Sequence, residues 1–292
     1  MASQHSPKYA NDPSLAAAAT FAVLFVISAT AHLVQLLRTR TWCFIAFLLG
    51  VLLEIVGFAC RAYNASESPD WSRGPFVVQL VLPLIAPALF TASIYMALDP
   101  LITSMGVRRF SISTKWLRIF VLADVLTLAA KCISGGVLAG ADSYDTVYLG
   151  RSIILFGVAI QFFFFAVFIV IVSILHYRIV CRPTSTSLLF AAPWKQYIWV
   201  IYMASLLITI RSSFKIAEFA VGSQNVLETS EAYLYCLDVA PMLLCSVLFN
   251  LWHPSRVMLS CSSQSFRPLE LEDGGMSTPD QQTPARRISY ED

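Results

Sequence analysis

Seven apolar stretches, separated by shorter polar stretches, run along most of this chain. Their expected bounds are 15–37, 42–63, 76–98, 116–139, 150–177, 197–219 and 233–252. A transmembrane helix needs about 20 consecutive, mostly apolar residues, and each stretch is long enough. The pattern predicts an all-α membrane protein, a bundle of seven transmembrane helices.

The two ends of the chain are polar. The first contains Pro7, Lys8 and Asp12, and the last is rich in Ser, Pro, Gln and charged side chains. Such composition is typical of disordered segments. We therefore expect a disordered extracellular tail over 1–14, a transmembrane domain over 15–253 and a disordered cytosolic tail over 254–292.

The composition points the same way. Of the 292 residues, 57% are hydrophobic and 13% charged, and the mean hydropathy is +0.67. A soluble domain is about 45–50% apolar and about 25% charged, so the chain belongs in a membrane. A net charge of +2 gives no indication of a nucleic-acid partner. No GxxxxGK[ST] motif is present, so any transport would be downhill, ion-coupled or driven by a partner.

Lysine and arginine are distributed unequally between the two sides of the predicted bundle. The side of the amino terminus holds Lys8, Arg73 and Arg151. The other side holds thirteen: Arg38, Arg40, Arg108, Arg109, Lys115, Arg118, Arg178, Arg182, Lys195, Arg256, Arg267, Arg286 and Arg287. Because cytoplasmic loops carry an excess of these residues, we expect the amino terminus outside and the carboxyl terminus in the cytosol.

A charged stripe lies near the end of the sixth predicted span. Arg211, Lys215 and Glu218 are four and three residues apart. At about 100° per residue, a helix places all three within roughly a 60° arc. Ionisable residues inside a bilayer are costly and nearly always face the protein interior or a wet cavity. The stripe therefore predicts an internal site.

Other predicted spans also carry ionisable residues, namely Glu54, Arg61, Asp124, Lys131 and Asp238. Together with the stripe they make four acids and four bases, a balance that predicts mutual pairing around a central cavity. We expect Glu54 and Lys131 near mid-depth, Asp124 nearer the cytosol and the others in the outer half. Glu54/Arg61, Asp124/Lys131 and Arg211/Glu218 are each seven residues apart, about two turns, so each pair shares a helix face.

Two interpretations of these residues stay open. In the first, Glu54, Arg61, Lys131, Arg211, Lys215, Glu218 and Asp238 bind or translocate a ligand, supported by Asp124 and Gln161. The head of a lipid that enters laterally would meet them, and protonation of Glu54 or Glu218 would couple the step to a proton gradient. In the second, the charges form a purely structural network that fixes helix rotation and order.

Few other motifs suggest chemistry. His32, His176 and His253 show no HxxxH or HExxH spacing, and the cysteines show no CxxC spacing. We expect no metal, no cofactor and no catalytic residue. Asn64-Ala65-Ser66 is a glycosylation sequon on the predicted outer side, and Ser289 follows two arginines as in a basophilic kinase site.

The chain resembles the fungal lipid-translocating exporter family, the RTA-like seven-helix membrane proteins. The most specific matching stretch is Arg211-Ser-Ser-Phe-Lys-Ile-Ala-Glu-Phe219, which ends at Gly222. Others follow in order along nearly the whole span region: His32 to Gln35, Glu54 to Phe58 with Arg61, Ala86-Pro87, Ser93 to Tyr95, Phe120 to Asp124, Gly135-Gly136, Gly157 with Gln161, and Glu231, Tyr235, Asp238, Met242 and His253-Pro254.

The resemblance implies export or flipping of amphipathic lipids such as sphingoid bases, tolerance of toxic sterol-like compounds, and a plasma-membrane location. Some members are similar to proteins beside secondary-metabolite pathways. Membrane lipids and a lipid-like small molecule would be the partners. The family usually has Arg where this chain has Lys215, and tends to have Gln where it has Lys131. Both departures bear on the substrate rather than the fold, because Lys215 lacks the planar fork of Arg and Lys131 adds a charge to the site.

An intramembrane enzyme would need convergent His or Ser/His/Asp side chains, which the sequence does not show. Two alternatives without transport or catalysis have the same predicted topology. One is a seven-helix receptor with an outside amino terminus, which would need a signalling partner on the basic loops and tail. The other is a stress-response sensor in the membrane. The sequence identifies no protein partner that would decide between them.

Overall fold

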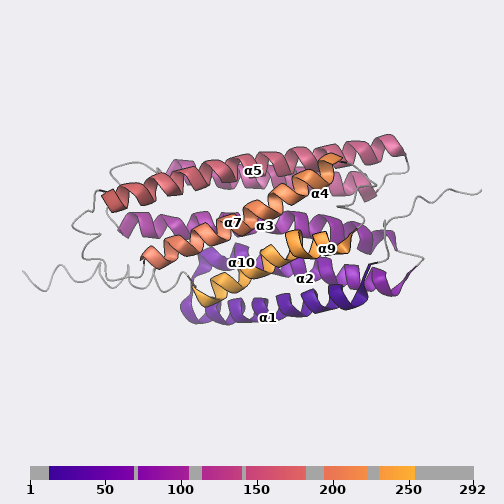
Figure 1. Cartoon of the computed structure of the whole chain (residues 1–292), viewed down its shortest axis with the longest axis horizontal. Helices are drawn as coiled ribbons and strands as arrows, with labels where there is room; N and C mark the ends of the chain where they lie inside the picture. Colours follow the sequence, from indigo (N-terminus) through magenta and orange to yellow (C-terminus); the bar gives the residue numbers. More distant parts are fainter. Residues whose placement is uncertain are drawn as a thin grey trace, which may run out of the picture.

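The computed structural model describes residues 13–68, 72–104, 114–139, 143–181, 194–221 and 230–253. These residues form helices and connecting turns, and the described part of the chain has no strand. The helices lie side by side along the long axis of the molecule (Figure 1). Apart from residues 13 and 14, the predicted tails lie outside the described residues.

Seven helical stretches are long and apolar enough to cross a membrane, which confirms the predicted seven-helix membrane fold. The first six helices are α1 (Leu15–Thr39), α2 (Ile45–Ser66, preceded by the 3-10 turn η1, Trp42–Phe44), α3 (Arg73–Ser104), α4 (Thr114–Ala139), α5 (Tyr144–Cys181) and α7 (Trp194–Val221). The seventh combines α9 (Glu231–Tyr233), the π-helical η3 (Leu234–Val239) and α10 (Ala240–Leu251).

Most helices run past the predicted apolar bounds because local contacts set their ends. The Ser14 hydroxyl accepts a hydrogen bond from the Ala17 N–H at 3.3 Å and caps the start of α1. At the other end Arg40 takes a left-handed conformation with φ of 53°, and its N–H donates to the Leu36 carbonyl. The start of α1 agrees with the predicted bound, and the cap at Arg40 extends its other end to Thr39, two residues past the predicted stretch.

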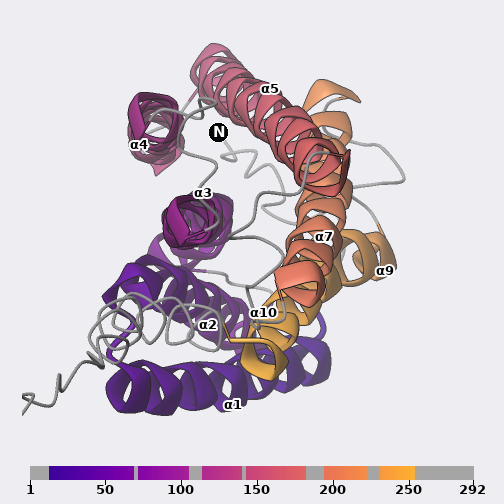
Figure 2. The same cartoon turned by 90° about the vertical axis from the view of Figure 1, so that its left-hand side faces the viewer.

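The helices form a closed ring in chain order. Each helix packs against the next, and α10 returns to pack against both α7 and α1. The end-on view in Figure 2 shows this ring. In it, α3 lies between α2 and α4, and α7 lies on the opposite side of the ring. Because α3 also touches α7, side chains from α2, α3, α4 and α7 can meet inside the ring.

Hydrogen bonds join α1 and α10, where the ring closes. The Ser28 and Ser246 hydroxyl oxygens are 2.6 Å apart, and the Asn250 amide donates to Ser28 Oγ at 2.7 Å. The Gln35 amide donates to the Asn250 carbonyl at 2.7 Å. In a bilayer, interhelical hydrogen bonds and close packing take the place of the hydrophobic effect. This seam therefore fixes the last helix against the first.

Close packing of α2 on α3 depends on two glycines that share one face of α2. A Cβ at Gly50 would lie 2.6 Å from the Phe90 ring, and one at Gly57 would lie 2.7 Å from the Pro83 ring. Any larger side chain would push the helices apart. Glu54 occupies the same helix face between the two glycines, so the contact that brings α2 onto α3 also buries Glu54.

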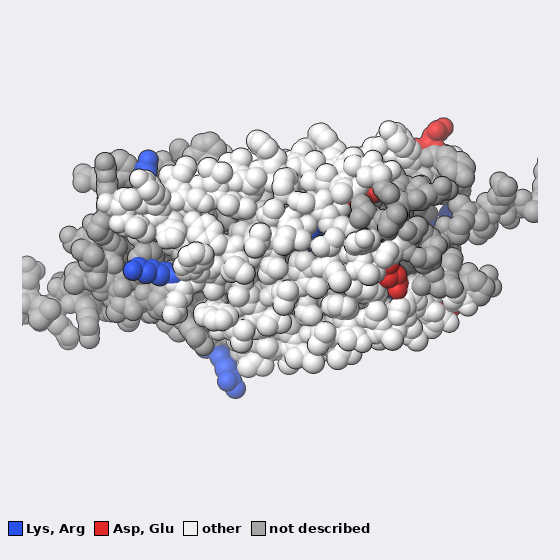
Figure 3. All heavy atoms as spheres, viewed as in Figure 1, with Lys and Arg blue, Asp and Glu red and all other residues white. Residues whose placement is uncertain are grey.

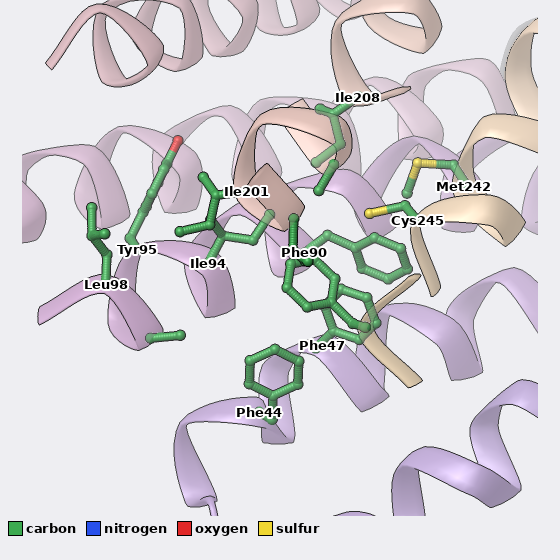
Figure 4. Packing of buried hydrophobic residues seen from close by; sticks show 14 of the residues in the cluster. Phe44, Phe47, Phe90, Ile94, Tyr95, Leu98, Ile201, Ile208, Met242 and Cys245 are labelled. Atoms are coloured by element: carbon green, nitrogen blue, oxygen red, sulfur yellow. The ribbon is translucent and has the colours of Figure 1, made fainter. Parts of the chain in front are cut away.

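Aromatic and aliphatic side chains fill the interior toward the end of the bundle where η1 lies. Phe47 of α2 stacks on Phe90 of α3 with ring centroids 4.1 Å apart, and Phe249 meets Phe47 edge-on at 5.2 Å. Figure 4 shows the Phe47 and Phe90 rings beside Ile201 and Ile208 of α7 and Cys245 of α10. The same core cluster continues into α1, α4 and α5, so every long helix contributes to it.

The outer surface is mainly apolar along the length of the bundle. Large apolar side chains point outward from several helices, including Ile27, Leu126, Phe156 and Phe163. In Figure 3 the protruding Lys and Arg atoms gather at one end and the Asp and Glu atoms toward the other. An apolar belt of this kind suits lipid contact. The outside position of the amino terminus stays a prediction.

Candidate functional site

Five charged side chains converge inside the bundle, and we call them the central charge cluster: Glu54 of α2, Arg211, Lys215 and Glu218 of α7, and Asp238 of η3. Arg211 Nε lies 2.7 Å from Asp238 Oδ1, and Lys215 Nζ lies 2.9 Å from Asp238 Oδ2. Lys215 Nζ also contacts Glu218 Oε2 at 2.8 Å. The predicted stripe on α7 therefore faces inward and pairs with an acid from another helix.

A proline in α3 supplies a further partner for Arg211. Proline has no backbone N–H, so Pro87 leaves the carbonyl of Pro83, four residues earlier, without its usual helical donor. Arg211 Nη2 donates to this carbonyl at 2.5 Å. Pro87 thus leaves a buried acceptor that the arginine satisfies.

The backbone around Asp238 departs from a regular α-helix. Leu234–Val239 forms a π-helical turn in which the Ala240 N–H donates to the Tyr235 carbonyl, five residues earlier. Single π-turns of this kind are frequent at functional sites, because they change the direction of side chains relative to an α-helix. Here the turn carries both buried residues that face the bases, Tyr235 and Asp238.

Lys131 lies in a second polar site, between α4, α3 and α5. Its Nζ donates to the Leu84 carbonyl at 2.9 Å and to Gln161 Oε1. Both partners are neutral, and among the described residues no carboxylate lies within ion-pair distance of Lys131. The prediction that Lys131 pairs with an acid is therefore not met, whereas Gln161 does form an interhelical hydrogen bond.

Asp124 lies further along the same face of α4. Thr91 of α3 donates its hydroxyl hydrogen to Asp124 Oδ2 at 2.6 Å. Asp124 and Lys131 are both buried, as their seven-residue spacing predicts, but each bonds to α3 rather than to the other. Thr91 is a partner that the sequence did not single out, because a threonine within an apolar stretch gives no signal of its own.

Arg61 pairs with Glu231, an acid just outside the predicted apolar stretches. Glu231 Oε1 contacts Arg61 Nη2, and Glu231 Oε2 accepts the backbone N–H of Ser14 at 3.0 Å. Arg61 Nε donates to the Tyr235 hydroxyl at 3.3 Å. One carboxylate thus connects α2, α9 and the start of α1. The spacing of Glu231, Tyr235 and Asp238, four and three residues apart, was the signal that could have found it.

The two predicted modification sites have different outcomes. Asn64 is fully buried in α2, so its side chain would have to turn outward before it could accept a glycan. Ser289 lies outside the described residues. In the described part of the chain, no group of three or more His, Cys, Asp and Glu side chains is arranged to hold a metal ion.

The charges of the central charge cluster do not balance. Three carboxylates face two bases. Glu54 has the weakest contact, because Arg211 Nη2 is 3.9 Å from its Oε1 and this oxygen accepts no hydrogen bond from any described residue. The geometry can therefore accept one additional positive charge, held by a proton or by a cationic group.

Comparison with known proteins identifies the family. The model of the RTA1-like protein family matches residues 47–260, which include most of the helices and the whole central charge cluster. The chain belongs to this family. The resemblance seen in the sequence is thereby confirmed.

Three relatives from Saccharomyces cerevisiae are similar to this chain over most of its length. Protein RTM1 is 32% identical over 214 residues, 73% of this chain and 67% of the relative. Sphingoid long-chain base transporter RSB1 is 29% identical over 278 residues, 83% of this chain and 72% of the relative. Protoporphyrin uptake protein 1 is 32% identical over 222 residues, 74% of this chain and 70% of the relative. No solved structure matches the chain.

These names place transport of lipid-like molecules within the RTA1-like family. A sphingoid base and a protoporphyrin are both largely apolar molecules with charged groups at one end or edge. Seven apolar helices and this family membership make the protein an integral, multi-pass membrane protein. The roles of individual residues do not come from these comparisons.

Proposed function

We propose that this RTA1-like protein translocates amphipathic lipids or lipid-like toxic compounds, such as sphingoid-base-like or sterol-like molecules, across a membrane. The observation that carries the proposal is the convergence of five charged side chains from α2, α7 and η3 inside a bundle with an apolar exterior. Charges at this depth are costly. The names of the relatives, two of which are transport or uptake proteins, support the same function.

The apolar surface and the buried charges suit the two parts of such a substrate. We infer that the tail stays in contact with lipid or with apolar side chains, while the polar head reaches the central charge cluster. A positively charged head would interact with Glu54, the carboxylate with the weakest partner. Desolvated charge pairs are strong and specific, so the cluster would select the head and not the tail.

Export from the cell, a role in toxin resistance and residence in the plasma membrane belong to the same proposal. They are what the family resemblance implies. A transport role also makes catalysis unnecessary, in agreement with relatives named as transporters. A receptor or sensor without transport is the alternative that the following experiment separates.

Movement of lipid in proteoliposomes tests the proposal directly. Purified protein would be reconstituted with a fluorescent sphingoid base or phospholipid, and the fraction moved between leaflets would be followed by dithionite quenching. Wild-type protein should accelerate movement over protein-free vesicles. Absence of movement for several head groups, with folded protein, would refute translocation and favour the receptor or sensor.

A conservative variant with a matched control links movement to the cluster. Arg211→Lys keeps the charge but cannot reach both Asp238 and the Pro83 carbonyl as the planar fork does. Loss of one charge-assisted hydrogen bond is worth about 1.5–3 kcal/mol, so the rate should fall about tenfold or more. Arg38→Lys changes the same residue type at an exposed position at the end of α1 and should leave the rate unchanged.

A further inference from the structure

Glu54 differs from the other acids of the central charge cluster because no base among the described residues lies within hydrogen-bond distance of it. Its side chain is 2% exposed. Asp238 takes contacts from both Arg211 and Lys215, and Glu218 takes one from Lys215. Arg211 in turn gives its short contacts to Asp238 and to the Pro83 carbonyl. Both bases of the cluster thus make their short contacts with other groups, and the distance from Glu54 to Arg211 stays at 3.9 Å.

The surroundings of Glu54 make an isolated negative charge expensive. On α2 it lies between Gly50 and Gly57, which press this helix face against the Phe90 and Pro83 rings of α3. The charged groups that act on Glu54 are Arg211 and Lys215 from α7 and Asp238 from η3. Neither α1 nor α3 presents a charged side chain to it among the described residues. Binding of a cation or a proton therefore stabilises this buried carboxylate.

We propose that Glu54 binds a proton and a cationic head group in alternation, so that the protein exchanges one proton for one cationic amphiphile. This inference rests on the proposed translocation function and specifies its coupling ion and substrate charge. A protonated Glu54 gives a cluster with two acids and two bases, which is neutral. An ionised Glu54 gives one excess negative charge, which a cationic head can neutralise.

The cycle balances in atoms and charge. On one side of the membrane the Glu54 carboxyl releases its proton, and the resulting carboxylate binds the cationic head. On the other side a proton binds the carboxylate and the cation leaves. No oxidant, reductant or covalent intermediate is needed. Because the same oxygen atoms take either partner, the two cannot be bound together, which is the condition for exchange.

A permanently charged probe tests the exchange without the trapping that affects weak bases. Proteoliposomes with an acidic lumen would receive a fluorescent alkyl trimethylammonium amphiphile, beside protein-free vesicles. One-for-one exchange predicts accumulation inside by about tenfold per pH unit, because each tenfold ratio corresponds to about 1.4 kcal/mol. The lumen should lose protons as the probe enters, which an internal pH dye reports.

Two variants that replace a carboxylate by its amide assign the effect to one side chain. Glu54→Gln should abolish both the accumulation and the proton loss. Asp145→Asn makes the same chemical change on an exposed carboxylate in the first turn of α5, outside the central charge cluster, and it should keep the tenfold ratio. Equal accumulation by wild type and Glu54→Gln, or wild-type uptake without proton loss, would overturn the proposal.

Infrared spectroscopy separates this proposal from the proposed function. Acidification should produce the carbonyl band of a protonated carboxyl group in wild-type protein, and Glu54→Gln should lack that band. If the band appears but no probe or lipid moves, the proton site stands and translocation fails. If lipids move but no Glu54-dependent band forms, translocation stands and the proton site fails. Thermal unfolding of each variant in detergent confirms that it is folded.

Discussion

Removal of Arg211 should destabilise this protein far more than removal of an ordinary interhelical hydrogen bond. The side chain is 4% exposed and contacts Asp238 at 2.7 Å, the Pro83 carbonyl at 2.5 Å and Glu54 at 3.9 Å. Arg211→Met keeps most of the side-chain volume but removes the charge. Lys215 would then be the base left to face three carboxylates.

The expected cost follows from the charge that is left behind. Breaking a buried ion pair by removing one partner costs about 3–5 kcal/mol, because the other charge stays buried and unpaired. An interhelical hydrogen bond in a membrane protein is worth about 0.6 kcal/mol on average. Arg211→Met should therefore lower the free energy of unfolding by about five to eight times as much as Ser246→Ala in the seam between α1 and α10.

Reversible unfolding in mixed micelles measures both variants under the same conditions. A double-mutant cycle adds the decisive comparison, because Asp238→Asn removes one of the acids that Arg211→Met leaves unpaired. The double variant should be more stable than the sum of the single changes predicts, by about 0.5–3 kcal/mol. A cost below about 1 kcal/mol for Arg211→Met, or strict additivity in the cycle, would refute a desolvated pair at this position.

Three further predictions concern other contacts. Gly50→Ala should destabilise by about 1–3 kcal/mol in the same assay, since its Cβ would lie 2.6 Å from the buried Phe90 ring; Gly136→Ala, with nothing within 4 Å of the new Cβ, is the control, and equal effects would contradict the packing argument. Lys131→Met should cost less than about 1 kcal/mol or stabilise, because its partners are neutral; a cost like that of Arg211→Met would reveal a counter-charge. Glu231→Gln should cost about 1.5–3 kcal/mol, since the carboxylate is only 23% exposed and accepts hydrogen bonds from Arg61 and the Ser14 N–H, and a loss below about 0.5 kcal/mol would be contrary to this.

The sequence by itself determined the membrane class, the number of spans and the inward direction of the charged stripe. Bilayer thickness fixes the length of an apolar helix, and the cost of charge in lipid forces Arg211, Lys215 and Glu218 to one internal face. Both constraints act on each helix separately, so the sequence of one segment is enough to predict its length and the direction of its charged face. The family resemblance rested on residues of the same kind, and the comparison confirmed it.

Partner choice was decided only by the tertiary structure. Residues seven apart share a helix face, but whether they pair depends on which helix lies opposite. The ring places η3 opposite Arg211, and α3 and α5 around Lys131. Asp238 therefore pairs with two bases, Lys131 receives neutral acceptors and Glu231 joins Arg61. Helix packing also singles out Glu54, because the close contact at Gly50 and Gly57 buries a carboxylate that no base on a neighbouring helix reaches at hydrogen-bond distance.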